Sequence, residues 1–173
     1  DTYRFPQGVT GDQIIAIMRE NFEAKTGKFL DGLSVAEQTR ILTVASLLEK
    51  EVRSARDMRL VAGVIENRLK RDMPLQLDAA VAYGACRKLF IQGAYCAVSQ
   101  VNLVDNIRKD SAYNIYMRKG LPPGPITNPG LQAIAAALHP EPSPYYYYLS
   151  DRAGVTHFSR TGTEHIQTRR LYF

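Results

Sequence analysis

The segment from Ser54 to Leu69 carries apolar side chains on two opposite faces, and this constrains the fold more than any other feature of the sequence. One apolar row recurs every three or four positions, as in an amphipathic helix. A second row follows the spacing i, i+4 and i+7. A helix that is apolar on two sides is expected to be sandwiched between packing partners. The first row is Met58, Val61, Ala62, Ile65 and Leu69, and the second is Leu60, Val64 and Asn67.

The remaining pattern predicts more helices and one late hairpin. A capping box of Thr10 and Gln13 marks the start of the first helix, and Asn128 is expected to cap a short helix after Pro129. Because helices come first and strands last, the order favours a helix-rich α+β fold with a short antiparallel hairpin near the C-terminus, in a single domain over residues 1–173. The expected helices span 10–24, 34–52, 54–69 and 131–138, the expected turns 25–32 and 151–154, and the expected strands or extended segments 75–83, 145–149 and 155–159.

The composition narrows the class of protein. The net charge of +5 is spread along the chain, and no motif of a nucleic-acid-binding fold accompanies it. No apolar run reaches the length of about 18 residues that a membrane span needs. Cys86 and Cys96 show neither a zinc spacing nor a redox C-x-x-C pair, so they form either one disulfide outside the cytoplasm or two free thiols. The sequence contains no metal-ligand spacing and no glycine-rich phosphate loop.

Two glutamates, Glu49 and Glu51, lie close together in the second expected helix. At about 100° per residue, Glu51 falls within the apolar face, between Val44 and Leu47, whereas Glu49 falls on its flank. A buried carboxylate needs a partner. Either an Arg or an amide neutralises it, or burial raises its pKa so that it acts as an acid near neutral pH. Asn67 also has two interpretations, since its amide would either fix neighbouring backbone or orient Glu51.

Several ordered segments resemble the YceG-like family of endolytic murein transglycosylases. The most specific is S-A-Y-N-I-Y-M-R-K-G-L-P-P-G-P-I-T-N-P-G, over residues 111–130. Together the segments cover essentially the whole chain, so on its motifs the sequence is identified as a member of this family. The others are T-V-A-S-L-L-E-K-E-V (43–52), V-I-E-N-R-L (64–69), L-Q-L-D-A-A-V-A-Y-G (75–84), A-A-L-H-P (136–140) and the tyrosine and T-H-F-S stretch over 146–159.

The resemblance implies the catalytic domain of a longer protein, with one N-terminal membrane helix and a LysM-like region missing from this chain. It implies a lytic transglycosylase, a carbon–oxygen lyase that cleaves the MurNAc–GlcNAc β-1,4 bond within glycan strands and leaves 1,6-anhydro-MurNAc ends. The implied location is the inner membrane, with the domain on the periplasmic or extracytoplasmic side. The implied partners are peptidoglycan strands and cell-wall synthases, with no nucleic acid, metal or cofactor. A non-catalytic glycan-binding or scaffold module is the alternative, and the retained E-K-E motif argues against it.

The family's essential acid is the second glutamate of E-K-E, which falls on Glu51, the residue that the helical wheel also singles out. The resemblance gives Glu51 the role of general acid and then of base. One acid suffices because the 6-hydroxyl of the substrate's own muramic acid supplies the nucleophile.

The matching motifs also supply polar and aromatic residues for binding the sugars. Among them, Asp78 is either a second carboxylate that steadies developing positive charge or the start of a turn. The chain departs from the family's usual pattern at Val52, at Ile115 and at 79–80, where Thr, Thr and Pro-Thr are usual. The substrate-binding residues expected from the resemblance are Asn67, Gln76, Asp78, Tyr83, Tyr113, Asn114 and Tyr116.

Overall fold

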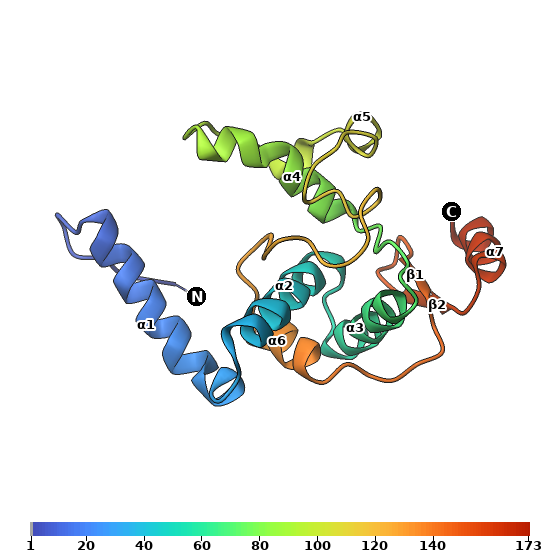
Figure 1. Ribbon diagram of the computed structural model, residues 1–173, viewed down its shortest axis with the longest axis horizontal. Helices are drawn as coiled ribbons and strands as arrows, with labels where there is room; N and C mark the ends of the chain where they lie inside the picture. The colour runs from blue at the N-terminus through green and yellow to red at the C-terminus, as the bar shows by residue number, and fades with distance from the viewer. Residues whose placement is uncertain (1) are drawn as a thin grey trace. The chain divides into compact units, whose positions relative to one another are not determined.

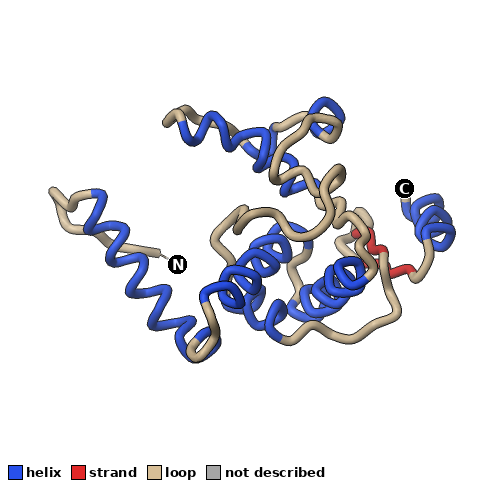
Figure 2. Tube along the Cα trace, viewed as in Figure 1, coloured by secondary structure: helices blue, strands red, loops and turns tan. Residues whose placement is uncertain are grey.

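The computed structural model describes residues 2–173, which fall into two compact units that divide after Ser34. The secondary structure is α+β, with many helices and a two-stranded antiparallel sheet near the C-terminus, as the sequence predicts (Figure 2). The single domain expected over residues 1–173 stays a prediction. None of the helices within residues 2–173 combines the length and the apolar character that crossing a bilayer requires.

The first unit contains helix α1 (Gly11–Leu30). Its start agrees with the predicted capping box: Thr10 Oγ1 accepts a hydrogen bond from the Gln13 N–H, and the Gln13 side chain accepts one from the Thr10 N–H. The turn predicted over 25–32 is wrong for most of its length, because the helix continues to Leu30. A single interior glycine, here Gly27, costs a helix only about 1 kcal/mol, so it does not end α1.

The second unit is built around three helices that pack against one another, α2 (Val35–Glu51), α3 (Ala55–Lys70) and α6 (Leu131–Leu138) (Figure 1). The start of α3 is fixed by Ser54, whose side chain accepts a hydrogen bond from the Asp57 N–H. The two-sided burial predicted for this helix is confirmed, since both of its apolar rows lie in the core. The buried members are Met58, Val61, Ala62 and Ile65 in one row and Leu60 and Val64 in the other.

The short helix α6 has its predicted bounds, but Asn128 is not its cap. Gly130 occupies the capping position and has no side chain with which to cap. Glu49 bonds to this residue instead, because its Oε2 accepts a 3.0 Å hydrogen bond from the Gly130 N–H. The exposed glutamate of the E-K-E motif therefore ties the loop ahead of α6 to the end of α2.

Helix α4 (Asp78–Ile91) shows that the extended segment predicted over 75–83 is wrong from Asp78 onward. Only Leu75 and Leu77 alternate, and so short an apolar run does not distinguish a strand from a helix. The alanines that follow favour a helix, and the Asp78 carboxylate at the first helical position is stabilised by the helix dipole.

A small substructure follows α4. It contains the 3-10 helix η1 (Val98–Gln100) and the helix α5 (Leu103–Asn106), and both contact α4. A disulfide between Cys86 of α4 and Cys96 ties this substructure to the helix. Of the two cysteine states that the sequence leaves open, the structure therefore has the bonded one.

The predicted hairpin is present as strands β1 (Tyr147–Ser150) and β2 (Thr156–Ser159), which pair antiparallel with Tyr148 opposite Phe158. Its turn is closed by Asp151, whose Oδ1 accepts hydrogen bonds from two backbone N–H groups of the turn. The strands lie within two residues of their predicted bounds. The hairpin thus brings the tyrosine run to the side of α3.

A last helix, α7 (Gly162–Tyr172), packs on both strands of the hairpin and is absent from the sequence-based expectation. Thr161 caps it, since its side chain accepts a hydrogen bond from the Glu164 N–H, and the Glu164 carboxylate accepts one from the Arg160 N–H. The spacing Thr161-x-x-Glu164 is a capping signal that could have revealed this helix.

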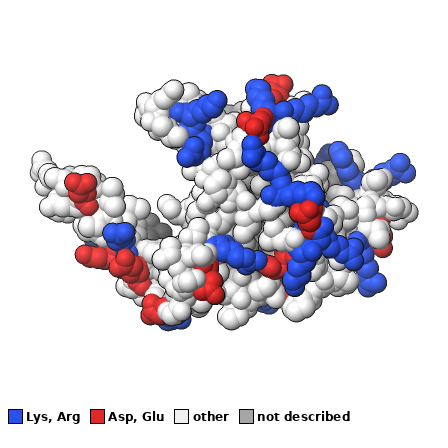
Figure 3. All heavy atoms as spheres, in the orientation of Figure 1, with Lys and Arg blue, Asp and Glu red and all other residues white. Residues whose placement is uncertain are grey.

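Charged side chains of both signs share the surface of the second unit. On the face shown in Figure 3, Lys and Arg side chains lie among Asp and Glu side chains. Several form ion pairs, such as Arg40 with Glu66 at 2.6 Å and Arg118 with Asp110 at 2.9 Å. At these places the positive charge of an arginine is therefore balanced by a neighbouring carboxylate.

Candidate active site

A cavity of about 290 Å³ lies between the end of α2, the start of α4 and the hairpin. Glu51, the last residue of α2, is part of its wall. Three more of the predicted site residues line the same cavity, namely Gln76, Asp78 and Tyr116. The fold therefore gathers four of the eight predicted residues around one hollow.

Glu51 is half-buried in this cavity, whereas Glu49 is exposed, which agrees with their positions on the helical wheel. The Tyr148 hydroxyl donates a 2.7 Å hydrogen bond to Glu51 Oε2. Burial raises the pKa of Glu51 above its ordinary value, the Tyr148 hydrogen bond lowers this pKa, and the charge of Asp78 raises it. Because burial is the largest effect, Glu51 keeps its proton to a higher pH than an exposed glutamate, as a general acid requires.

Asp78 forms a second pair of a carboxyl group and a phenol in the cavity. The Tyr116 hydroxyl donates a 2.5 Å hydrogen bond to Asp78 Oδ1. Burial raises the pKa of Tyr116 above its ordinary value, and the adjacent carboxylate raises it further. Tyr116 therefore stays protonated and keeps donating to Asp78, so that the two carboxyl groups of the cavity are each held by one tyrosine.

Arg68 of α3 also lines the cavity, although it is buried and was not among the predicted residues. Its Nε donates a 2.7 Å hydrogen bond to the Tyr146 carbonyl, and its Nη1 donates one of 2.7 Å to the Leu75 carbonyl. The guanidinium lies 5.1 Å from the centroid of the Tyr147 ring. Arg68 thus connects the start of the hairpin to the segment that carries Gln76.

Gln76 has a backbone φ of +54°, a left-handed conformation that is uncommon for a residue other than glycine. Its N–H donates a 3.0 Å hydrogen bond to the Ile115 carbonyl, and its neighbours Leu75 and Leu77 are buried. These anchors hold the strained residue with its side chain exposed at the cavity. Backbone strain of this kind is concentrated at functional sites.

His165 reaches the cavity from α7. Its ring stacks on Tyr147 with the centroids 5.4 Å apart, and its Nδ1 is the buried side-chain atom that lacks a hydrogen-bond partner within residues 2–173. Burial lowers the pKa of His165, and the positive charges of Arg68 and Arg169 lower it further. The ring is therefore neutral at physiological pH, and its Nδ1 has no hydrogen-bond partner within residues 2–173.

Four of the predicted site residues lie outside the cavity, and Asn67 is the first of them. Its Nδ2 donates hydrogen bonds of 2.8 Å to the Ser143 carbonyl and 2.9 Å to the Tyr145 carbonyl. The amide thus fixes neighbouring backbone, which is the first of the two interpretations given above.

Tyr83 and Tyr113 also lie outside the cavity. Their rings pack against each other edge to face, with the centroids 4.9 Å apart, and this contact supports α4.

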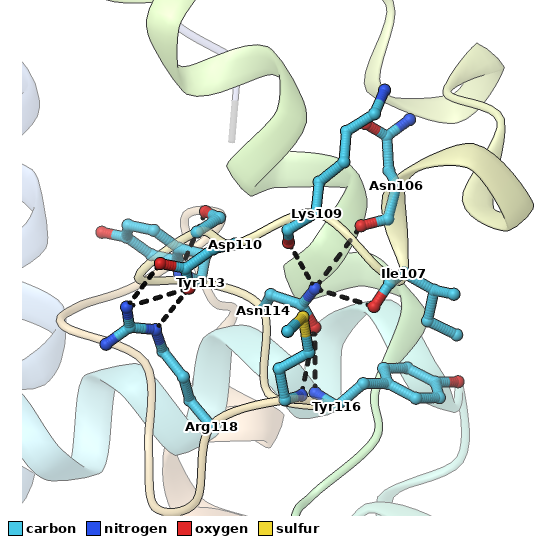
Figure 4. A network of polar contacts seen from close by, with 10 residues as sticks. Asn106, Ile107, Lys109, Asp110, Tyr113, Asn114, Tyr116 and Arg118 are labelled. Atoms are coloured by element: carbon cyan, nitrogen blue, oxygen red, sulfur yellow. Dashed lines mark hydrogen bonds and ion pairs between the residues drawn. The ribbon is translucent and has the colours of Figure 1, made fainter.

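Asn114 is fully buried and organises the loop that carries Tyr116 (Figure 4). Its Nδ2 donates to the carbonyls of Ile107 and Lys109 at 2.9 and 2.7 Å, and its Oδ1 accepts from the Tyr116 N–H at 3.1 Å. Asn114 is not exposed to a ligand. Its effect on the cavity comes through the position of Tyr116.

The other residues of the cavity wall were missed by sequence reasoning, and they include the apolar Leu75 and Leu77 and four polar or aromatic side chains: Arg68, Tyr147, Tyr148 and His165. The sequence pattern places the two tyrosines in a strand, but the local pattern of that strand does not show which of the rings contacts α2. Arg68 directly follows Asn67 in the V-I-E-N-R-L segment and had no separate signal. His165 depended on recognising α7.

A half-buried carboxyl group in a cavity lined by tyrosines is the kind of acid–base site that glycosidic-bond cleavage uses. The model of the YceG-like family matches residues 1–170, and the chain belongs to this family. It is similar to the endolytic murein transglycosylase of Bacillus subtilis (strain 168), with 38% identity over 133 residues that cover 77% of this chain. The endolytic murein transglycosylase of Streptococcus pneumoniae (strain D39) is 33% identical over 168 residues, or 95% of this chain.

The fold has a counterpart among solved structures. A crystal structure of a YceG-like protein from Listeria monocytogenes superposes with a TM-score of 0.81 and 35% identity, and the match covers 97% of this chain and 53% of that one. The chain spans 34% of the length of the Bacillus relative and 29% of the Streptococcus relative. It therefore corresponds to one part of these longer proteins.

Proposed function

We propose that this chain is the catalytic part of an endolytic peptidoglycan lytic transglycosylase, with Glu51 as its acid and base. The observation that carries the proposal is the half-buried Glu51 carboxyl group, which the Tyr148 hydroxyl holds in a cavity at 2.7 Å. The names of the two relatives, each an endolytic murein transglycosylase, support murein as the substrate.

The proposed reaction breaks the β-1,4 bond between MurNAc and GlcNAc within a strand. Protonated Glu51 donates its proton to the glycosidic oxygen, which leaves with the GlcNAc as a hydroxyl. The Glu51 carboxylate then accepts the proton of the muramic acid 6-hydroxyl, whose oxygen bonds to the anomeric carbon and closes the 1,6-anhydro ring. Asp78 stabilises the positive charge that develops on the sugar. Positioned acid–base catalysis typically contributes about 10² to 10⁴-fold to the rate.

The test is the substitution Glu51→Gln, compared with Glu49→Gln, on purified glycan strands. Mass spectrometry of the products would count 1,6-anhydro-MurNAc ends. Glu51→Gln is expected to abolish them, because an amide has no acidic proton to donate. Glu49→Gln is expected to keep them, because the Gln oxygen still accepts the hydrogen bond from Gly130. Full activity of Glu51→Gln would refute the mechanism, and reducing ends from the parent protein would indicate a hydrolase.

We also propose an extracytoplasmic location for this domain, on a protein anchored in the inner membrane by one N-terminal helix and working beside cell-wall synthases. The disulfide between Cys86 and Cys96 supports this location, because disulfides persist in oxidising compartments. Fusion of the full-length protein to a reporter that is active only outside the cytoplasm would test it. An inactive reporter behind this domain would contradict the proposed location.

A further inference from the structure

A second groove, larger than the cavity at Glu51, lies between the start of α3, the loop over 141–145 and the hairpin. Its volume is about 570 Å³, within the range of about 300 to 1,000 Å³ that is typical of ligand sites. We call it the hairpin groove and define it by the lining residues used below. These are Arg56, Asp57, Glu141, Tyr145, Thr156 and Phe158.

The floor of the hairpin groove is held in place by three successive turns of α3. The Arg59 carbonyl accepts a 3.0 Å hydrogen bond from the Glu141 N–H. One turn later, a Cβ on Gly63 would lie 2.1 Å from the Glu141 carbonyl oxygen, so only glycine permits this close approach. Another turn on, the Asn67 amide bonds the carbonyls of residues 143 and 145. The groove is thus fixed by specific contacts before any ligand arrives.

The lining of the groove combines aromatic ring faces with hydrogen-bonding groups, a chemistry that suits a sugar. The rings of Tyr145 and Phe158 lie 5.5 Å apart and provide apolar faces against which a pyranose can pack. Two carboxylates, on Asp57 and Glu141, can accept hydrogen bonds from hydroxyl groups. Arg56 supplies donors for sugar hydroxyl and N-acetyl oxygens and for the lactyl carboxylate of a MurNAc residue, so the groove offers both donors and acceptors.

The hairpin groove and the cavity at Glu51 share one wall. Phe158 lines the groove and lies opposite Tyr148 in the hairpin, with the ring centroids 6.3 Å apart. Tyr148 in turn donates to Glu51. We infer that the hairpin groove is a second saccharide subsite, which binds the glycan strand beyond the sugars at the cleaved bond. This inference rests on the proposed function, and it explains how a small cavity acts within a long strand rather than at its end.

The experiment measures binding separately from cleavage. Peptide-free glycan fragments, a disaccharide and an octasaccharide, are titrated calorimetrically into the Glu51→Gln variant, alone and combined with Tyr145→Leu or Arg56→Ala. The matched controls are Tyr95→Leu and Arg108→Ala, which change an exposed tyrosine and an arginine outside the groove. Circular dichroism confirms that each variant is folded, and leucine keeps bulk beside Phe158 while removing the flat polar ring.

We expect each groove variant to bind the octasaccharide roughly tenfold more weakly, a typical loss for one truncated contact at a site's centre. Disaccharide binding and both control variants should be unchanged. Equal octasaccharide affinity in the groove variants and the controls would overturn the inference, as would binding that requires stem peptides on the glycan. If the parent protein fails to cleave strands but the groove variants still lose octasaccharide affinity, the proposed function fails and the saccharide subsite stands.

Discussion

The Tyr148 hydroxyl reaches from β1 to the last residue of α2 and donates a 2.7 Å hydrogen bond to Glu51 Oε2. Burial raises the pKa of Tyr148 well above its ordinary value, so the phenol keeps its proton and acts only as a donor here. In the proposed mechanism, this leaves Oε1 as the oxygen that carries the transferable proton. Tyr148 thus fixes the direction of the Glu51 carboxyl group and, under that proposal, decides which of its oxygens is the acid.

Tyr148→Phe is therefore expected to lower kcat by about ten- to a hundredfold, the scale of a misplaced catalytic group. It should also move the alkaline limb of the pH–rate profile to higher pH. The hydrogen bond lowers the pKa of Glu51, so its loss raises that pKa, and the acid stays protonated further into the alkaline range. Arg68 and Asp78, which also face Glu51, are unchanged by the substitution. Initial rates across a pH series would check this, and a limb that stays in place or moves to lower pH would contradict it.

Glu51→Gln should stabilise the protein at alkaline pH. The pKa of Glu51 is raised in the folded state, so its contribution to stability is complete below the unfolded value of about 4.3 and is lost as the pH rises through the folded value. Glutamine never ionises and avoids this loss. Thermal midpoints should therefore be higher for the variant at pH 8 and converge with those of the parent near pH 4. A parent protein that is the more stable at pH 8 would refute the expectation.

Gly63→Ala is expected to destabilise the fold by about 2 kcal/mol, the scale of overpacking a tight contact. The added Cβ would lie 2.1 Å from the Glu141 carbonyl oxygen, a backbone atom that cannot swing aside. Gly11→Ala is the matched control, because a Cβ added to that helical glycine would meet no atom within 4 Å. Urea denaturation of both variants would measure the difference. Equal midpoints would show that the loop over 141–145 yields more easily than its contacts suggest.

Asn114→Asp changes one atom and should cost about 3 kcal/mol of stability. The amide group donates to three backbone carbonyls, and a carboxylate oxygen in its place would repel all three. Because the loop carries Tyr116, activity should fall as well. Asn128→Asp is the control, since its side chain is exposed at the surface and lies outside this loop. Denaturant midpoints that match for the two variants would contradict this account of the loop.

The sequence allowed the local part of the site to be predicted. Helical periodicity separated Glu51 from Glu49, because side-chain direction along one helix depends only on its own geometry. The same reasoning failed where contacts are distant. Tyr148 lies 97 residues from Glu51 along the chain, and Arg68 meets the hairpin across a similar separation. Such pairs depend on how the strands and helices pack, which no local pattern encodes.

The fold was predictable to a comparable degree. The cores of α2 and α3 follow from their apolar rows, but α4 does not, because the alternation of Leu75 and Leu77 ends one residue before the helix begins. Asn67 illustrates the limit for single residues. Its burial was expected from the row it belongs to, whereas its partners, the carbonyls of Ser143 and Tyr145, lie in a loop far along the chain.

The two glutamates at the end of α2 also restrict how this helix can change in length. Glu49 holds the Gly130 N–H and Glu51 holds the Tyr148 hydroxyl, so a single turn of α2 is bonded both to the loop ahead of α6 and to strand β1. Removing or adding one residue within α2 would rotate both carboxyl groups by about 100° and disconnect both at once. Insertions and deletions should therefore be tolerated in the connecting loops but excluded from α2, whose register is as essential to the site as the identity of its acid.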